Sequence, residues 1–373
     1  MVEPARADDP VDPRRAWAEF VDRLRIAGER VGAAVDGLGP IEAADGYRAL
    51  LRALNNQLGR FEVDRERPEL VPFNGWREKF LMDNPDFRYW VADIRDDRRY
   101  RIVGAMGSAV YLSVTAYAAR GLTDTSAAAR IDSDALEISA DGSFELTLSR
   151  DRPDDGQERA WLELPEGATS VWVRLFHDGL LRGGADADRL GWCRIEPIDD
   201  PPAPPPIDPA RFVAHLARSG SVVAHVPRII DAATAEDLAA PNTVRHWSEM
   251  TGGAAFTEPG IHYLRGAWQL DAGEALVVEG DLVPCRYWNL LLYSRFLNSL
   301  DHRHRVVSRT AATSTLVDGH FRFVLAGERT DGDWLDTEGR PFGIFVMRFL
   351  QPARPPDLPT VRRLRLSELE RAT

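Results

Sequence analysis

The chain has 373 residues, enough for two or three domains of ordinary size. Apolar residues make up 44% and charged residues 28%, which excludes wholesale disorder. The formal net charge is −12, so the chain lacks the basic surface that nucleic-acid binding usually needs. The two cysteines, Cys193 and Cys285, form neither a disulfide framework nor a metal-spaced pair.

The sequence predicts a cytoplasmic protein that does not contact membranes. No apolar run approaches the roughly 20 residues of a membrane-spanning helix, and residues 1–10 lack the apolar core of a signal peptide. One of the 46 basic residues is a lysine, Lys79, and the others are arginines. We interpret that ratio as a G+C-rich coding bias.

Residues 1–83 are predicted to form a helical region. Asp12 is a good N-cap, and Pro13 suits the first position of a helix because that position needs no N–H donor. Apolar residues then recur at spacings of three and four until Gly37. A second helix is expected from about Ile41 to Phe61, and the prolines that follow break its pattern.

In residues 84–198 the apolar residues recur at every second position, and we interpret this region as a first β-sandwich unit. Strands are expected at residues 87–91, 100–104, 110–114 and 171–175, and Asp141-Gly142 predicts a hairpin turn. Many short strands of this kind are typical of a sandwich or a small barrel.

A run of prolines within residues 201–206 predicts a semi-rigid spacer and the boundary between the β regions. We assign residues 199–260 to this linker and to two helices, one beginning at Asp208 and one running from about residue 234 to 247. Strand character returns in residues 261–352, the predicted second β unit. Residues 353–373 are expected to be a C-terminal tail.

The two β regions repeat the same residues in the same order. Gly104 and Tyr111 correspond to Gly280 and Tyr287, and the Asp-Gly turn recurs at residues 318–319. The pair Trp161-Leu162 corresponds to residues 334–335, and a later arginine recurs in each copy, at 174 and 348. The separation drifts by only a few residues, as loop insertions would produce. The sequence therefore predicts an internal duplication.

Several motifs resemble an uncharacterised bacterial family, domain of unknown function 1214 (DUF1214), which is often paired with the related family 1254. The first copy contains Asn84-Pro85-Asp86 and Arg99-Tyr100-Arg101-Ile102; the second contains residues 285–289, Ser299-Leu300-Asp301 and residues 333–337. The second copy is the more similar. The resemblance implies a β-sandwich of jelly-roll kind and no established activity.

Our fold prediction is a mainly β protein with two tandem jelly-roll-like antiparallel β-sandwich units and with helices at the N-terminus and between the units. We hypothesise an enzyme of lyase or hydrolase type that binds a small organic or glycosidic substrate in a cleft of the second unit. Imidazoles titrate near neutral pH, so the expected catalytic residues are His302, His304 and the adjacent Asp301. The expected substrate-binding residues are Arg286, Tyr287, Trp288, Trp334 and Arg348. On this hypothesis His304→Ala abolishes turnover without unfolding the protein.

Two alternatives stay open at this stage. The protein could instead be a non-catalytic accessory protein that binds a ligand or carbohydrate by aromatic stacking. If residues 302–304 form a strand, both histidines point the same way and could hold a metal ion, but a third ligand is required and no spacing identifies one. We therefore expect no cofactor and a small-molecule ligand as the partner. The sequence is also compatible with a homo-oligomer.

Overall fold

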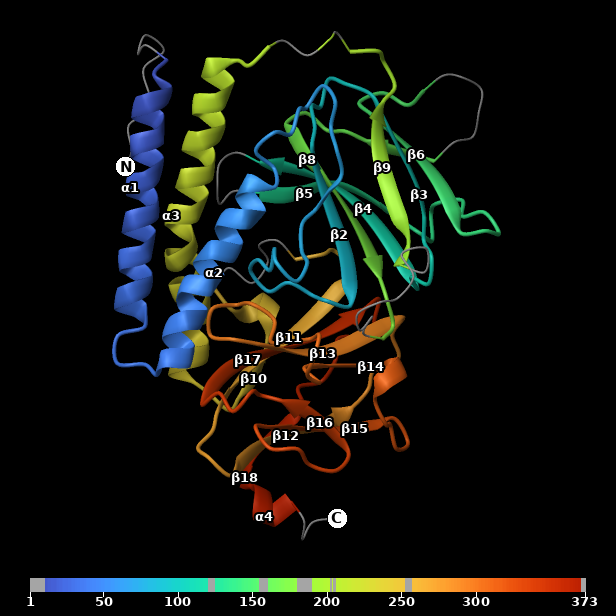
Figure 1. The fold of residues 1–373 in the computed structure, drawn as a ribbon. Helices are drawn as coiled ribbons and strands as arrows, with labels where there is room; N and C mark the ends of the chain where they lie inside the picture. Colours follow the sequence, from blue (N-terminus) through green and yellow to red (C-terminus); the bar gives the residue numbers. More distant parts are fainter. Residues whose placement is uncertain are drawn as a thin grey trace.

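Two β-sandwich units are stacked, and three long helices lie along one flank of the molecule (Figure 1). The computed structural model describes residues 11–119, 125–153, 160–179, 190–201, 203, 206–251 and 257–369. The predicted N-terminal tail, residues 1–10, and three prolines of the predicted spacer, at 202, 204 and 205, lie outside the described residues.

The helices begin where the sequence predicts. Helix α1 (Pro13–Ala34) starts at Asp12, whose carboxylate accepts a hydrogen bond from the backbone N–H of Arg14. Helix α2 (Pro40–Leu58) also has a proline at its first position. Helix α3 (Pro209–Ala239) starts at Asp208 in the same way as α1. None of the described helices is both long and apolar enough to cross a membrane.

Helix α3 corrects the prediction of two helices between the β units. It is one helix of 31 residues with Pro227 in its interior, and it ends before the predicted second helix would. A proline removes one hydrogen bond and bends a helix without always ending it. The residues after Ala239 instead form strand β10 (Val244–His246) and a short 3₁₀ helix, Trp247–Glu249.

The first unit consists of two sheets that share one core. One sheet has the order β1-β2-β8-β4-β5 and the other the order β7-β6-β3-β9. The strands are β1 (Val71–Pro72), β2 (Phe87–Asp93), β3 (Tyr100–Ala105), β4 (Tyr111–Ala119), β5 (Thr125–Asp132), β6 (Ser143–Ser149), β7 (Trp161–Glu163), β8 (Ala168–Phe176) and β9 (Trp192–Pro197). Side chains from both sheets, such as Ile102, Leu112 and Val173, are fully buried together.

The second unit repeats this topology strand for strand. Its sheets have the orders β10-β11-β17-β13-β14 and β16-β15-β12-β18. The strands after β10 are β11 (Ile261–Gln269), β12 (Glu274–Asp281), β13 (Tyr287–Tyr293), β14 (Ser308–Thr310), β15 (His320–Ala326), β16 (Asp333–Asp336), β17 (Phe342–Leu350) and β18 (Thr360–Arg365). Even the parallel pairing of β6 with β7 recurs between β15 and β16. The predicted duplication and the mainly β fold are confirmed.

Two local predictions were wrong. Residues 353–373 are not only a tail, because β18 pairs with β12 and completes the second sandwich, followed by helix α4 (Leu366–Leu369). The Asp141-Gly142 turn does not join a hairpin. Gly142 does adopt the predicted positive φ, 83°, but the strand before the turn, β5, pairs with β4 in the opposite sheet.

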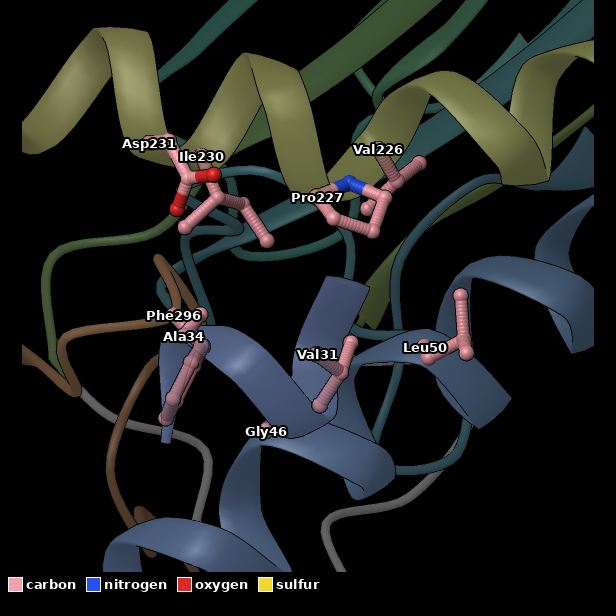
Figure 2. Close-up of a pocket in the computed structure, with 9 residues that line it drawn as sticks. All are labelled: Val31, Ala34, Gly46, Leu50, Val226, Pro227, Ile230, Asp231 and Phe296. Carbon is pink, nitrogen blue, oxygen red and sulfur yellow. The ribbon is translucent and has the colours of Figure 1, made fainter. Parts of the chain in front are cut away.

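The helices meet at small side chains. Figure 2 shows an apolar crevice where α1, α2 and α3 approach each other, with Pro227 of α3 facing Val31 of α1. Gly46 of α2 lies at its floor, where an added Cβ would come within 3.0 Å of Phe296. The crevice has a volume of only about 10 Å³, room for one water. We therefore interpret it as a packing defect between helices.

Candidate functional site

A polar cleft of about 270 Å³ opens between α2, the segment that follows α2 and loops of the second β unit. Helix α2 and the segment after it contribute Asp45, Arg48, Arg52, Trp76 and Lys79. The loops contribute Ser294, Ser299, Asp301, Arg305, Glu338 and Arg340. Five basic side chains therefore line the cleft together with three acidic ones.

Two of the five bases are neutralised by carboxylates. Arg340 is buried and forms ion pairs with Glu42 at 3.0 Å and with Glu338 at 3.0 Å. Arg305 forms an ion pair with Asp336 at 2.7 Å. These bases hold the walls of the cleft together and have little charge left for a ligand.

The other three bases, Arg48, Arg52 and Lys79, form no ion pair with a carboxylate of the described residues. Arg52 is only 7% exposed and donates a hydrogen bond to Asn298 Oδ1 at 3.2 Å. Burial lowers the pKa of Arg52, and the positive charge of Arg48 lowers it further. Arg48 is exposed, and its guanidinium lies 5.9 Å from the centre of the Trp76 ring.

Lys79 lies at the bottom of the cleft and is 1% exposed. Its Nζ donates hydrogen bonds to the backbone carbonyls of Ser299 at 2.6 Å and Leu300 at 2.8 Å. The same nitrogen lies 4.6 Å from the centre of the Trp76 ring, a cation–π distance. Burial lowers the pKa of Lys79 to about 8, partly opposed by the charge of Asp83.

The segment that carries Lys79 is strained and firmly held. Leu81 and Met82, neither of them glycine, have φ values of 34° and 64°. Such conformations persist only where the surroundings fix them. Here Asp83 accepts hydrogen bonds from the backbone N–H of Ser299 at 2.8 Å and from its hydroxyl at 2.7 Å. The segment thus positions Lys79 against the second unit.

Sequence reasoning missed Lys79, Arg48, Arg52 and Trp76. The signal for Lys79 was present in the composition, because a coding bias strong enough to give 45 arginines should have replaced a freely exchangeable lysine. Nothing in the sequence marked the two arginines of α2, since an arginine on a helix is normally solvated.

The three predicted catalytic residues lie at the edge of this cleft, in a turn and not in a strand. Asp301 lines the cleft, and its Oδ1 accepts the backbone N–H of Arg303 at 3.1 Å. His302 is half-buried, and its ring packs edge-on against Trp76 at 5.3 Å. Burial and the charge of Lys79 lower the pKa of His302 to about 4. His304 is exposed.

The five predicted substrate-binding residues do not converge on the cleft. Arg286 forms a surface ion pair with Asp134 of the first unit. Trp288 is buried inside the second sandwich, and Trp334 packs on the outer face of its second sheet. Tyr287 and Arg348 are buried where the two units meet. Among the described residues, no group of three or more histidines, cysteines or carboxylates is placed to hold a metal ion.

Arg348 and its counterpart Arg174 belong to a buried polar layer between the two units. In the first unit, Arg174 pairs with Glu258 at 2.5 Å and donates to Tyr117 at 3.1 Å. In the second, Arg348 donates to Tyr293 at 2.7 Å, but its Nη1 has no partner among the described residues.

Asp86 is a buried carboxylate of the same layer, and the charge of Arg348 acts on it. Its Oδ2 accepts hydrogen bonds from Asn289 at 2.9 Å and Ser308 at 2.7 Å, and its Oδ1 has no partner among the described residues. Burial raises the pKa of Asp86. The two copies of the layer are therefore not equivalent: Arg174 of the first copy forms an ion pair, whereas Arg348 of the second forms none with the part of the chain that the structure describes.

Comparison with known proteins confirms the resemblance to DUF1214. Residues 91–178 match the model of the family described as "Protein of unknown function (DUF1214)". These residues lie in the first β unit, whereas the motifs predicted the closer resemblance in the second. No curated protein matches the chain.

One solved structure shows the same architecture over nearly the whole chain. An uncharacterised protein from Burkholderia cenocepacia superimposes with a TM-score of 0.86 at 26% identity, over 95% of this chain and 97% of that one. The VPA0106 protein from Vibrio parahaemolyticus gives a TM-score of 0.49 at 11% identity, over 92% of this chain and 100% of that one. Neither comparison assigns an activity.

Proposed function

We propose that this relative of the DUF1214 family is an enzyme of lyase or hydrolase type that binds a small organic anion in the cleft. The observation that carries the proposal is a set of three bases, Arg48, Arg52 and Lys79, that form no ion pair with a carboxylate in the described part of a chain of net charge −12. Buried or clustered cations are normally paired, so an unpaired set indicates a charge that a ligand supplies.

The cleft fits an organic acid better than a glycosidic substrate. Guanidinium groups bind carboxylates and phosphates through paired hydrogen bonds. A sugar would need open aromatic faces, but Lys79 and Arg303 already lie over the Trp76 ring, at 4.6 and 5.0 Å. Arg48 and Arg52 would hold the anionic group.

Asp301 and His302 are the groups we propose for proton transfer. Asp301 lines the cleft and His302 flanks it beside Trp76. With a pKa near 4, the imidazole of His302 is neutral at pH 7 and would accept a proton only from a strongly acidic group. His304, which is exposed, would have to move inward to act on a ligand in the cleft.

The test is ligand binding followed by turnover. We expect small carboxylates to raise the melting temperature, and Arg48→Gln to weaken their binding about tenfold, the typical loss of one charged hydrogen bond. The matched control is Arg354→Gln, which removes an exposed arginine paired with Asp357. The proposal fails if neither carboxylates nor phosphate bind, or if both variants bind like the wild type.

Non-catalytic binding is the second candidate, and it is favoured by the small number of proton-transfer groups in the cleft. Incubating each bound acid with the protein and following its NMR spectrum separates the two functions. Chemical change of the acid, lost in Asp301→Asn, supports the enzyme. Binding with no change in any acid supports a binding protein.

A further inference from the structure

We propose that Lys79 forms a covalent imine with an organic acid that also carries a ketone or aldehyde group. This inference rests on the proposed function, because the arginines that bind the acid would bring its carbonyl carbon to the lysine. The first observation is the identity of the residue: 45 of the 46 basic residues are arginine, and the remaining lysine is the most buried of the five bases that line the cleft.

An arginine could not do this chemistry at position 79. A guanidinium stays protonated at any physiological pH, whereas the amine of a buried lysine can lose its proton and attack a carbonyl. Lys79 is 1% exposed yet lines the cleft, so it faces the bound ligand and little bulk water. A lysine is the one basic side chain that such a step can use.

The surroundings hold the nitrogen in place, and burial makes its proton easier to lose than that of an ordinary lysine. Two of its donors are used by the carbonyls of Ser299 and Leu300, which leaves one position on the nitrogen for a ligand. Arg48 and Arg52 disfavour the ammonium, while Asp83 and Glu338 favour it. The balance, dominated by burial, places the pKa of Lys79 at about 8, so the amine is available near neutral pH.

The step balances without any further reactant. The neutral amine of Lys79 forms a nitrogen–carbon bond with the carbonyl carbon, and the carbonyl oxygen leaves as water with the two hydrogens of the amine. The products are the imine and one water molecule. A protonated imine withdraws electrons from the neighbouring carbon, which is the activation that lyases of carbon–carbon bonds require.

The experiment traps the imine with sodium cyanoborohydride, which delivers a hydride to the imine carbon and leaves a stable secondary amine. Pyruvate and glyoxylate are the probes, and lactate and glycolate, which lack the carbonyl, are the matched controls. The adduct is measured by mass spectrometry of the intact protein and located by peptide mapping. Because the chain has one lysine, the only other amine is its terminal α-amino group.

That α-amino group is an internal control of matched basicity, since its ordinary pKa is about 7.7–8.0. If basicity alone determined the reactivity of the two amines, both would be labelled equally. We expect at least about tenfold more adduct on Lys79, because the arginines hold the carbonyl beside it. Arg52→Gln should reduce the Lys79 adduct about tenfold and leave labelling of the α-amino group unchanged.

The outcomes separate this proposal from the previous one. If lactate binds by calorimetry but pyruvate leaves no adduct on Lys79, the imine is wrong and the anion site stands. If the adduct appears equally on both amines, the labelling is unspecific and the imine is wrong. If lactate binds and competes with pyruvate for labelling of Lys79, both proposals are supported. The readout needs only the wild-type protein, so it does not depend on how Lys79 variants fold.

Discussion

Lys79, Arg52 and His302 share one physical feature: burial lowers the pKa of each below its ordinary value. Each side chain is held where its charged form is disfavoured, and each lies near the positive charge of another. An anion in the cleft would relieve this repulsion, whereas added protons would increase it. Binding an anion in the cleft and losing a proton from one of these side chains therefore have the same effect: each reduces the repulsion between positive charges.

A pH prediction follows for His302. Its folded pKa, about 4, lies below the ordinary value of 6.5. As the pH falls from 6.5 towards 4, the unfolded chain takes up a proton that the folded protein does not, so stability is lost in this window. We expect His302→Gln to make the fall in the free energy of unfolding shallower there. His304→Gln, which removes an exposed imidazole two residues away, should not. Equal slopes in the wild type and both variants, measured by urea denaturation at each pH, would contradict the prediction.

The sequence predicted this part of the site only in outline. The segment 301–304 was identified from its residue types, and it does lie at the cleft. The partners of residues 298–302 come from α2 and from residues 76–79, more than 200 positions away in the chain. No local sequence pattern predicts such a contact. The strained backbone at Leu81 and Met82, which brings Lys79 into that contact, cannot be predicted from the spacing of apolar residues either.

Secondary-structure elements were predictable where a local signal dominated. Both N-cap aspartates, Asp12 and Asp208, were identified from the sequence because a short acidic side chain before a proline marks a helix start. Strand β18 was missed because arginines occupy half of its positions and obscure the alternation of apolar and polar residues that marks a strand. Its backbone pairs with β12, and Glu274 and Glu279 of that strand form ion pairs with Arg363 and Arg362.

The cap of α3 allows a direct measurement. Asp208→Ala removes the carboxylate that accepts the N–H of Ala210 at 2.9 Å, and we expect it to lower the free energy of unfolding by about 1 kcal/mol. Asp231→Ala removes an exposed aspartate from the body of the same helix and should change stability by less than about 0.5 kcal/mol. Chemical denaturation followed by circular dichroism gives both values. A loss in Asp231→Ala as large as that in Asp208→Ala would mean that capping is not the cause.

At the scale of the whole molecule, the duplication was predictable but the contact between the copies was not. The segment that precedes β2 places Asp86 on the second unit, beside Asn289 and Ser308. The segment that precedes β11 places Glu258 on the first unit, beside Arg174. Each copy therefore contributes an acid to the other. This exchange follows from how the two copies stack against each other. A repeat in the amino-acid sequence does not reveal that arrangement.

The exchanged acids should make the two units unfold together. Glu258 is 4% exposed and accepts hydrogen bonds from Arg130 at 2.9 Å and Arg174 at 2.5 Å. Glu258→Gln keeps the shape of the side chain but leaves both arginines without their shared carboxylate. Because an uncompensated buried charge is costly, we expect a loss of about 3–5 kcal/mol and a second transition in urea as the units uncouple.

The matched control for this prediction is Glu196→Gln. Glu196 also accepts hydrogen bonds from two arginines, Arg101 at 2.8 Å and Arg194 at 2.6 Å, but at the surface, where such pairs contribute little to stability. A wild-type protein with one transition, a Glu196→Gln variant like it and a Glu258→Gln variant with two would show that the buried layer couples the copies. If Glu258→Gln is no less stable than Glu196→Gln, the apolar contacts among Phe87, Phe176 and Tyr287 hold the units together instead.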